Sequence, residues 1–284
     1  MMRAALVVSI CVAVAFSVAR GDDRGVDASA AFLESHFLVT WYGNPHSAGM
    51  GVLGQRTGTE RALGLQRQAA AYAPLTSKAV VAAYHLVAVV AQPAPGAGRA
   101  WRRRESPEVI RALLEEARVH GFLLVLDVQA GRSSLQEELE YLRPFLREPD
   151  VHLALDPEFD MTEGQVPGTH LGHTHAADVN AAVDFLERMI VAERLPPKIL
   201  IVHQFTLGML PDKEAIRDSL SVDVVLDMDG FGTQSLKRAS YAAIHRQRHL
   251  PFSGIKLFYK QDTDLLSPEQ VMELDPMPAV VIYQ

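Results

Sequence analysis

The sequence predicts a single (β/α)₈ barrel, and three observations support that fold class. Eight apolar, strand-like segments alternate with seven amphipathic segments, which is typical of βα units around a parallel sheet. Several of the apolar segments end in acidic or amide side chains, at the end of the strands where such a barrel carries its site. The chain has 284 residues, 48% of them hydrophobic, which suffices for one large core.

The predicted strands are segments rich in β-branched and aromatic residues: 37–42, 80–90, 122–129, 151–158, 199–205, 222–229, 255–259 and 279–283. Successive side chains of a strand point to opposite faces. In the fourth strand, Val151, Leu153 and Leu155 therefore share one face, suited to packing under helices. Asp156 and Glu158 fall on the other face and are predicted to point into the mouth of the barrel.

The predicted helices are the amphipathic segments between these strands: 59–72, 106–120, 134–146, 177–194, 212–220, 235–248 and 267–274. Ser106 and Ser267 each precede a proline, which places a capping serine before proline at the first helical position. Gly121 follows the second helix, where a left-handed C-cap is expected. No helix is predicted after the eighth strand, and we expect residues 28–36 to cover the gap that this leaves.

The first residues predict a secretory signal peptide, with a basic start, an apolar stretch and small residues around Ala19. We assign 1–25 to the signal peptide and leader, cleaved near Ala19, and 26–284 to the barrel, which predicts a secreted or extracytoplasmic protein. An uncleaved anchor is the alternative, but the apolar stretch is short against the roughly 20 residues of a membrane span. Lipidation of Cys11, the only cysteine, is disfavoured because Ile10 stands where a small residue is expected.

The net charge of −7, without a long basic run, argues against nucleic acid as a partner. A local basic group follows the second strand and comprises Arg99, Arg102, Arg103 and Arg104. It is either a site that attracts an anionic substrate, such as an acidic or phosphorylated sugar, or a solvated surface. The expected partner is a glycan or another small polar substrate.

Asp156 and Glu158 are the strongest candidates for chemistry. They lie two residues apart on one strand face, which places their Cα atoms about 6.6 Å apart. Their mutual repulsion can separate their pKa values, so that one carboxyl stays protonated and acts as an acid. A protonated carboxyl beside a second carboxylate is the core of glycoside hydrolysis. The alternative is that both side chains only cap loop amides or bind basic side chains at the rim.

The Asp-x-Glu pattern on the fourth strand resembles that of barrel glycosidases, including the chitinase-like enzymes and the lysozyme-like muramidases. The resemblance implies that Glu158 is the general acid and Asp156 its modulator, with Asp227 or Asp229 on the sixth strand as a further contributor. The longer acidic run that precedes the motif in chitinases is replaced here by apolar residues, which argues against substrate-assisted chitin chemistry.

Polar and aromatic residues near the other strand ends are expected to shape the substrate pocket. They are Tyr42, His85, Asp127, Gln129, His203, Gln204, Asp227, Lys256 and Tyr283. Lys256 is either a Schiff-base lysine of an aldolase or the partner of Asp227 or Asp229 in a salt bridge.

Two other function classes remain open. His170, His173 and His175 lie in the loop after the fourth strand, at a spacing that can bind zinc. They would serve a metal-dependent hydrolase, or they are solvent-exposed loop residues. The third possibility is a barrel without activity that binds carbohydrate or cell-wall material. Our first prediction is an exported glycoside hydrolase in which Glu158, Asp156 and Asp229 are catalytic, with no metal and no cofactor.

Overall fold

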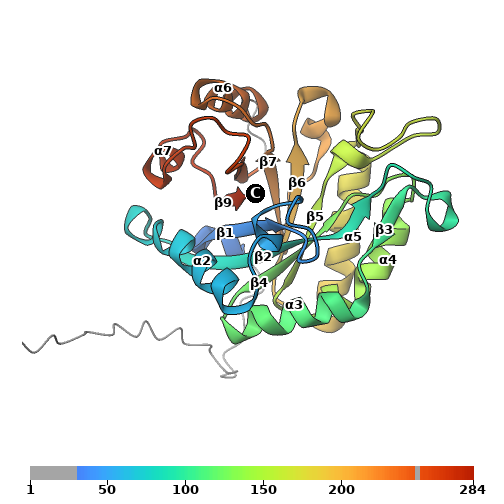
Figure 1. The fold of residues 1–284 in the computed structure, drawn as a ribbon, viewed down its shortest axis with the longest axis horizontal. Helices are drawn as coiled ribbons and strands as arrows, with labels where there is room; N and C mark the ends of the chain where they lie inside the picture. The colour runs from blue at the N-terminus through green and yellow to red at the C-terminus, as the bar shows by residue number, and fades with distance from the viewer. Residues whose placement is uncertain (1–30, 247–249) are drawn as a thin grey trace, which may run out of the picture.

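A computed structural model describes residues 31–246 and 250–284 and shows a closed barrel of parallel strands (Figure 1). The barrel strands are β1 (His36–Gly43), β2 (Ala79–Ala91), β4 (Leu123–Val128), β5 (Val151–Leu155), β6 (Lys198–Gln204), β7 (Val222–Met228), β8 (Phe252–Leu257) and β9 (Val280–Tyr283). Each strand pairs in parallel with the next, and the β9–β1 and β1–β2 pairings close the ring. The short β3 (Arg102–Arg104) pairs antiparallel with the end of β2. The predicted (β/α)₈ fold class is confirmed.

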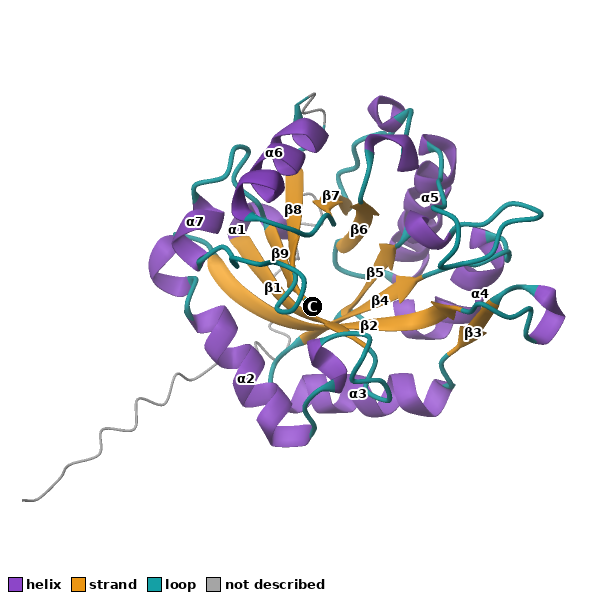
Figure 2. Ribbon diagram, turned by 45° about the horizontal axis from the view of Figure 1, so that its top comes forward, coloured by secondary structure: helices purple, strands orange, loops and turns teal. Residues whose placement is uncertain are grey.

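Helices surround the barrel (Figure 2). They are α2 (Gly58–Ala70), α3 (Pro107–Val119), α4 (Leu135–Leu146), α5 (Ala176–Glu193), α6 (Gln234–His245) and α7 (Pro268–Met272). Capping serines begin three of them, and the Ser106, Ser134 and Ser267 side chains accept hydrogen bonds from amides three residues on. Gly121 follows α3 with a φ of 69°, as the expected C-cap requires.

The helix predicted over 212–220 is absent, and this prediction is wrong. The segment forms only a 3₁₀ turn, Lys213–Ala215. The side-chain amide of Asn180 on α5 donates to the Ala215 carbonyl and accepts from the Arg217 amide, each at 2.9 Å. Arg217 also bonds Glu187 of α5 at 2.6 Å. These side-chain contacts satisfy backbone groups that a helix would otherwise pair.

The described part of the segment before β1, residues 31–35, lies at the N-terminal end of the barrel, so it does not cover the side that we predicted. The short helix α1 (Phe32–Ser35) is held there by the Leu33 amide, which donates to Asp223 Oδ2 at 2.7 Å. Tyr72, just after α2, packs instead against the outside of β1 and β9. Its ring lies 5.0 Å from that of Phe37, and its hydroxyl oxygen lies 2.6 Å from that of Tyr283.

Two predicted strand boundaries also shift. The fourth strand ends at Leu155, because Pro157 begins a 3₁₀ turn, Pro157–Phe159. The strand predicted to begin at residue 255 begins at Phe252.

The buried residues form two layers. Most apolar side chains pack between the strands and the helices, and a smaller apolar cluster fills the barrel interior. Val125, Ala154, Ile201 and Val225 belong to the interior cluster. Beyond them, towards the C-terminal ends of the strands, the inward side chains become polar.

No helix among the described residues is long and apolar enough to cross a membrane. The predicted signal peptide and leader, 1–25, lie outside the described residues.

Candidate functional site

The polar interior begins with four inward side chains from alternate strands of the barrel. Tyr42 comes from β1, Asp127 from β4, His203 from β6 and Lys256 from β8. In this fold, inward side chains of alternate strands form layers that are usually filled by branched apolar residues. Here the layer is polar, although no member is more than 4% exposed. Buried polar groups need hydrogen-bond or ion-pair partners, and most of the polar groups in this layer have one.

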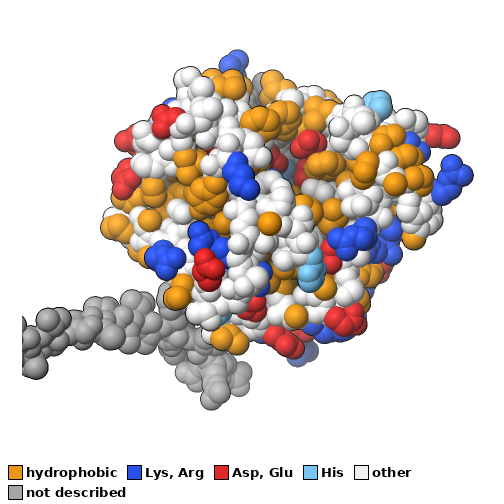
Figure 3. Space-filling model, viewed as in Figure 1, with side chains coloured by type: hydrophobic (Ala, Val, Ile, Leu, Met, Phe, Trp, Pro, Cys, Tyr) orange, Lys and Arg blue, Asp and Glu red, His pale blue; other side chains and the backbone are white. Residues whose placement is uncertain are grey.

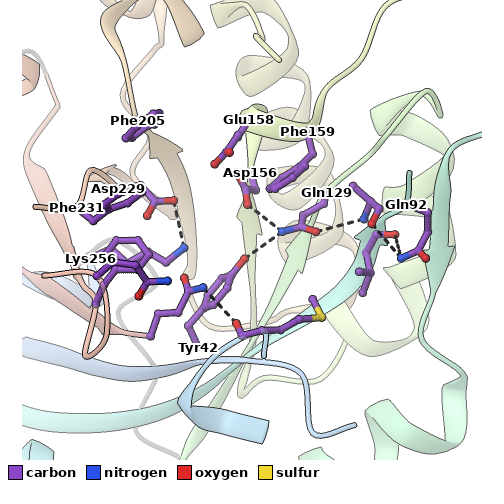
Figure 4. Close-up of a pocket in the computed structure, with 16 residues that line it drawn as sticks. Tyr42, Gln92, Gln129, Asp156, Glu158, Phe159, Phe205, Asp229, Phe231 and Lys256 are labelled. Carbon is purple, nitrogen blue, oxygen red and sulfur yellow. Dashed lines mark hydrogen bonds and ion pairs between the residues drawn. The ribbon is translucent and has the colours of Figure 1, made fainter. Parts of the chain in front are cut away.

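Gln129 ties two strands of this interior together (Figure 4). Its Oε1 accepts from the Ala91 amide at 3.2 Å, which directs its Nε2 towards the cavity side. Nε2 donates to the Tyr42 hydroxyl at 3.3 Å and to Asp156 Oδ2 at 3.1 Å. Tyr42 in turn donates to Asp127 Oδ2 at 2.8 Å. The Asp156 carboxyl is therefore held in place by β4 rather than by its own loop.

Lys256 is the basic side chain of the site. Its Nζ lies 3.1 Å from Asp229 Oδ2 and 3.7 Å from the centre of the Tyr42 ring. Burial by itself would lower the pKa of Lys256, but Asp229, Asp156 and other carboxylates outweigh it and raise the pKa. A Schiff-base lysine needs a lowered pKa. The geometry therefore favours the salt bridge to Asp229 over the aldolase alternative.

A cavity of about 480 Å³ lies above this layer, at the C-terminal end of the strands. Asp156, Glu158 and Asp229 line it, and an oxygen from each lies within 4.8 Å of the other two. In Figure 3 the front face shows acidic side chains in a hollow between hydrophobic ones. The three carboxyls predicted as catalytic are thus brought together.

The pKa values of Glu158 and Asp156 are shifted in a direction that suits proton transfer. Burial raises the pKa of Glu158, and the neighbouring Asp229 charge raises it further, while Lys256 opposes the shift. Burial, followed by the charge of Asp127, raises the pKa of Asp156 well above its usual value. The site can therefore hold a protonated carboxyl beside Asp229, which is paired with an ammonium group.

Asp227 and His85 lie inside the barrel, beneath the cavity, and do not line it. Asp227 Oδ2 lies 3.0 Å from Nδ1 of His203, and burial raises the pKa of Asp227 to about 7. A Cβ atom at Gly254 would lie 2.7 Å from Asp227 Oδ1, so only glycine leaves space for this carboxyl. The two predicted residues thus support the site from below.

Gln204 and Tyr283 are not part of the site, contrary to expectation. Gln204 follows inward-facing His203, so strand alternation turns it to the helix side, where its Nε2 donates to the Thr206 carbonyl at 3.1 Å. Tyr283 follows inward-facing Ile282 and likewise faces outward. Sequence alternation alone contained this information, because neighbouring residues of one strand cannot share a face.

Three of the four arginines of the basic group are paired with two buried acidic side chains. Arg102 and Arg104 both bond Glu138 at 2.7 Å, and Arg103 bonds Glu105 at 2.6 Å. None of them lines the cavity. The observed pairs therefore argue against a site for an anionic substrate.

Within the described part of the chain the loop histidines form no three-ligand cluster, although Nδ1 of His175 lies 3.4 Å from Oδ2 of Asp212. The rings of His173 and His175 lie 5.8 Å apart, and His170 Nδ1 lies 2.8 Å from Thr169 Oγ1. Among the described residues, no group of three potential metal ligands includes any of the three histidines.

An aromatic rim was missed at the level of sequence. It consists of Phe159, Phe205, Phe231 and Phe258, all of which line the cavity. Phe205 and Phe258 directly follow β6 and β8, so their position after a strand end was the available signal. Phe231 is 51% exposed and stacks on Phe205, with ring centres 6.1 Å apart.

A scan against protein-family models finds no family that matches this chain, and a search of curated proteins finds no significant relative. The function is therefore inferred from the geometry.

Proposed function

We propose that the protein is a glycoside hydrolase that cleaves its substrate in the cavity at the C-terminal end of the barrel. The observation that carries the proposal is the pairing of Glu158, whose pKa is raised, with Asp229, whose oxygen lies within 4.8 Å and is bound to Lys256. A protonated carboxyl and an ionised one flanking a cavity are the two groups that this reaction requires.

Glu158 is suited to the role of general acid. Its side chain is only partly buried and makes no hydrogen bond to any described residue, so it is free to reach a leaving oxygen. Asp156 lies beside it, fixed by Gln129, and the charge of Glu158 contributes to the raised pKa of Asp156. In this assignment Asp156 is a positioning and modulating residue.

Asp229 is suited to the role of nucleophile. Its Oδ2 is bound to Lys256, whereas its Oδ1 has no hydrogen-bond partner. Retaining enzymes hold their two carboxyls about 5–5.5 Å apart, and inverting enzymes roughly 6.5–9.5 Å. One oxygen of Asp229 and one of Glu158 lie within 4.8 Å of each other, which is close enough for the retaining arrangement.

The aromatic rim supports a sugar as the substrate. Phenylalanine rings at the edge of a polar cavity, of which Phe231 is the exposed one, offer apolar faces on which sugar C–H groups stack. The proposed setting is outside the cytoplasm, where the leader-like start of the chain would direct the protein.

The test is cleavage of a panel of polysaccharides and aryl glycosides by the wild type and by Glu158→Gln. We expect the substitution to lower kcat/KM by about 10²–10⁴-fold. The loss should be smaller for aryl glycosides whose leaving group needs no protonation. Glu163→Gln, on the exposed part of the same loop, is the matched control and should retain full activity.

Two results would contradict the proposal. Equal activity of Glu158→Gln and the wild type on unactivated glycans would remove Glu158 from the reaction. Glycan binding that survives in Glu158→Gln, with no turnover by either protein, would indicate a carbohydrate-binding barrel instead.

A further inference from the structure

Beneath the cavity, three potential metal ligands converge from three different strands. They are His85 of β2, Asp127 of β4 and His203 of β6, and each is 0% exposed. One ligand-type atom from each lies within 4.8 Å of the other two. The two imidazole rings have their centres 5.5 Å apart. This cluster lies deeper in the barrel than the carboxyls of the proposed reaction.

Each of the three side chains carries a buried polar atom without a partner. These atoms are Nε2 of His85, Nε2 of His203 and Oδ1 of Asp127. More than nine in ten buried polar groups in proteins are hydrogen-bonded, so one orphaned atom is uncommon. Three of them on side chains that converge point to a ligand that would satisfy all three.

The other polar atoms of two of these side chains are already engaged. Nδ1 of His203 lies 3.0 Å from Oδ2 of Asp227, and a tyrosine hydroxyl of β1 donates to Oδ2 of Asp127 at 2.8 Å. Metal-binding histidines usually use one ring nitrogen for the ion and the other for a carboxylate or carbonyl. His203 has this arrangement, with Asp227 as the outer partner and Nε2 free.

The charge of the interior favours a cation at this point. Asp127, Asp156, Asp227 and Asp229 are all buried, and the ammonium group of Lys256 stands against them. Buried carboxylates need a compensating charge or a proton. A divalent ion bound by Asp127 would supply two positive charges.

We propose that His85, Asp127 and His203 bind a divalent transition-metal ion such as Zn²⁺. Two imidazoles with one carboxylate favour such ions over Mg²⁺ and Ca²⁺, which prefer oxygen ligands. Bonds of about 2.0–2.2 Å to one tetrahedral ion would place the ligand atoms roughly 3.3–3.6 Å from one another, which is within the 4.8 Å limit that the three atoms meet here. The site requires neither Glu158 nor the loop histidines, and it goes beyond the proposed hydrolysis.

The test uses the full chain, stripped with a chelator and then titrated with ZnCl₂ or, in parallel, with MgCl₂. We expect about one zinc ion per chain by elemental analysis, and a rise in the unfolding temperature with zinc but not with magnesium. His85→Gln should weaken zinc binding by more than about 100-fold. The double variant His173→Ala/His175→Ala is the matched control and should bind zinc as the wild type does.

Two further measurements test the proposed metal site even if His85→Gln does not fold. Asp227→Asn keeps the three ligands but removes the carboxylate behind His203, and should weaken zinc binding by about 10–100-fold. Co²⁺ bound to the wild type should give the visible absorption of a site with nitrogen and oxygen ligands.

Three results would overturn the inference: no zinc-dependent stabilisation of the stripped wild type, full zinc binding by folded His85→Gln, or loss of zinc in the loop double variant. These results are independent of the proposed hydrolysis. Glu158→Gln should bind zinc normally even though it loses glycan cleavage. Zinc binding by a wild type that cleaves no glycan would support the metal site and contradict only the proposed hydrolysis.

Discussion

Replacing Lys256 with methionine should strongly destabilise the barrel, because it removes the ammonium group that neutralises the buried carboxylates. The Lys256 and Asp229 side chains are only 3% and 5% exposed, so solvent screens their interaction little. Breaking a buried ion pair by removing one partner costs about 3–5 kcal/mol. We expect a loss of that size in the free energy of unfolding.

The direction of the pKa shift of Lys256 determines the pH at which stability should be measured. The folded protein raises the pKa of Lys256 above 10.5, so its stabilising contribution is fully present below about pH 10.5 and is lost as the pH rises through the folded value. Urea unfolding at pH 7.5 therefore measures the whole effect. Lys260→Met, an exposed lysine four residues on, is the control and should change stability by less than about 0.5 kcal/mol.

The double variant Lys256→Met/Asp229→Asn separates the ion pair from simple loss of packing. Removing both charges should recover at least about 2 kcal/mol of the single-variant loss, because no unpaired carboxylate remains at that position. Strictly additive effects of the two substitutions, or a Lys256→Met loss no larger than that of Lys260→Met, would refute the reasoning.

Three further predictions test the scaffold. Burial raises the pKa of Asp223 to about 6, so its protonation stabilises the fold at low pH. Its contribution to stability should fall by about 2 kcal/mol as the pH rises from 4 to 7, and urea unfolding at each pH should show a decline that is smaller by about that amount in Asp223→Asn than in the wild type, because other buried carboxyls, Asp227 among them, also titrate in this range. Gly254→Ala should cost about 1–3 kcal/mol by crowding a buried carboxylate, whereas Gly208→Ala, with open space around it, should cost far less in the same assay. Tyr283→Phe leaves the Tyr72 hydroxyl unpaired and should cost about 1–3 kcal/mol in calorimetry without changing substrate affinity; a weaker affinity would show that this residue reaches the cavity after all.

Much of the fold was predictable because its signals are local. Alternation of strand and helix segments indicated the barrel, and the capping serines marked helix starts that the structure confirms. The helix prediction for 212–220 failed because Asn180, more than 30 residues away in sequence, forms hydrogen bonds with backbone groups of this segment. No local pattern contains that contact.

The residues of the candidate site were also predictable only in part. Asp156 and Glu158 line the cavity as predicted, although β5 ends at Leu155 and Glu158 reaches the cavity from a 3₁₀ turn rather than from the strand. Strand alternation, applied to each residue separately, excludes Gln204. Alternation puts Phe205 and Phe258, which fall at the ends of two predicted strands, on the inward face, whereas Phe159 and Phe231 lie in loops, where sequence periodicity says nothing about direction.

The sequence by itself determined which face of each strand a side chain occupies, because the two-residue repeat of a strand is a local property of the backbone. Only the tertiary structure decided which inward side chains meet. His85, Asp127 and His203 come from separate strands, and their convergence depends on the register and closure of the barrel. The ion pair between Lys256 on β8 and Asp229, which follows β7, sets the charge of the site and likewise depends on the pairing of these two neighbouring strands.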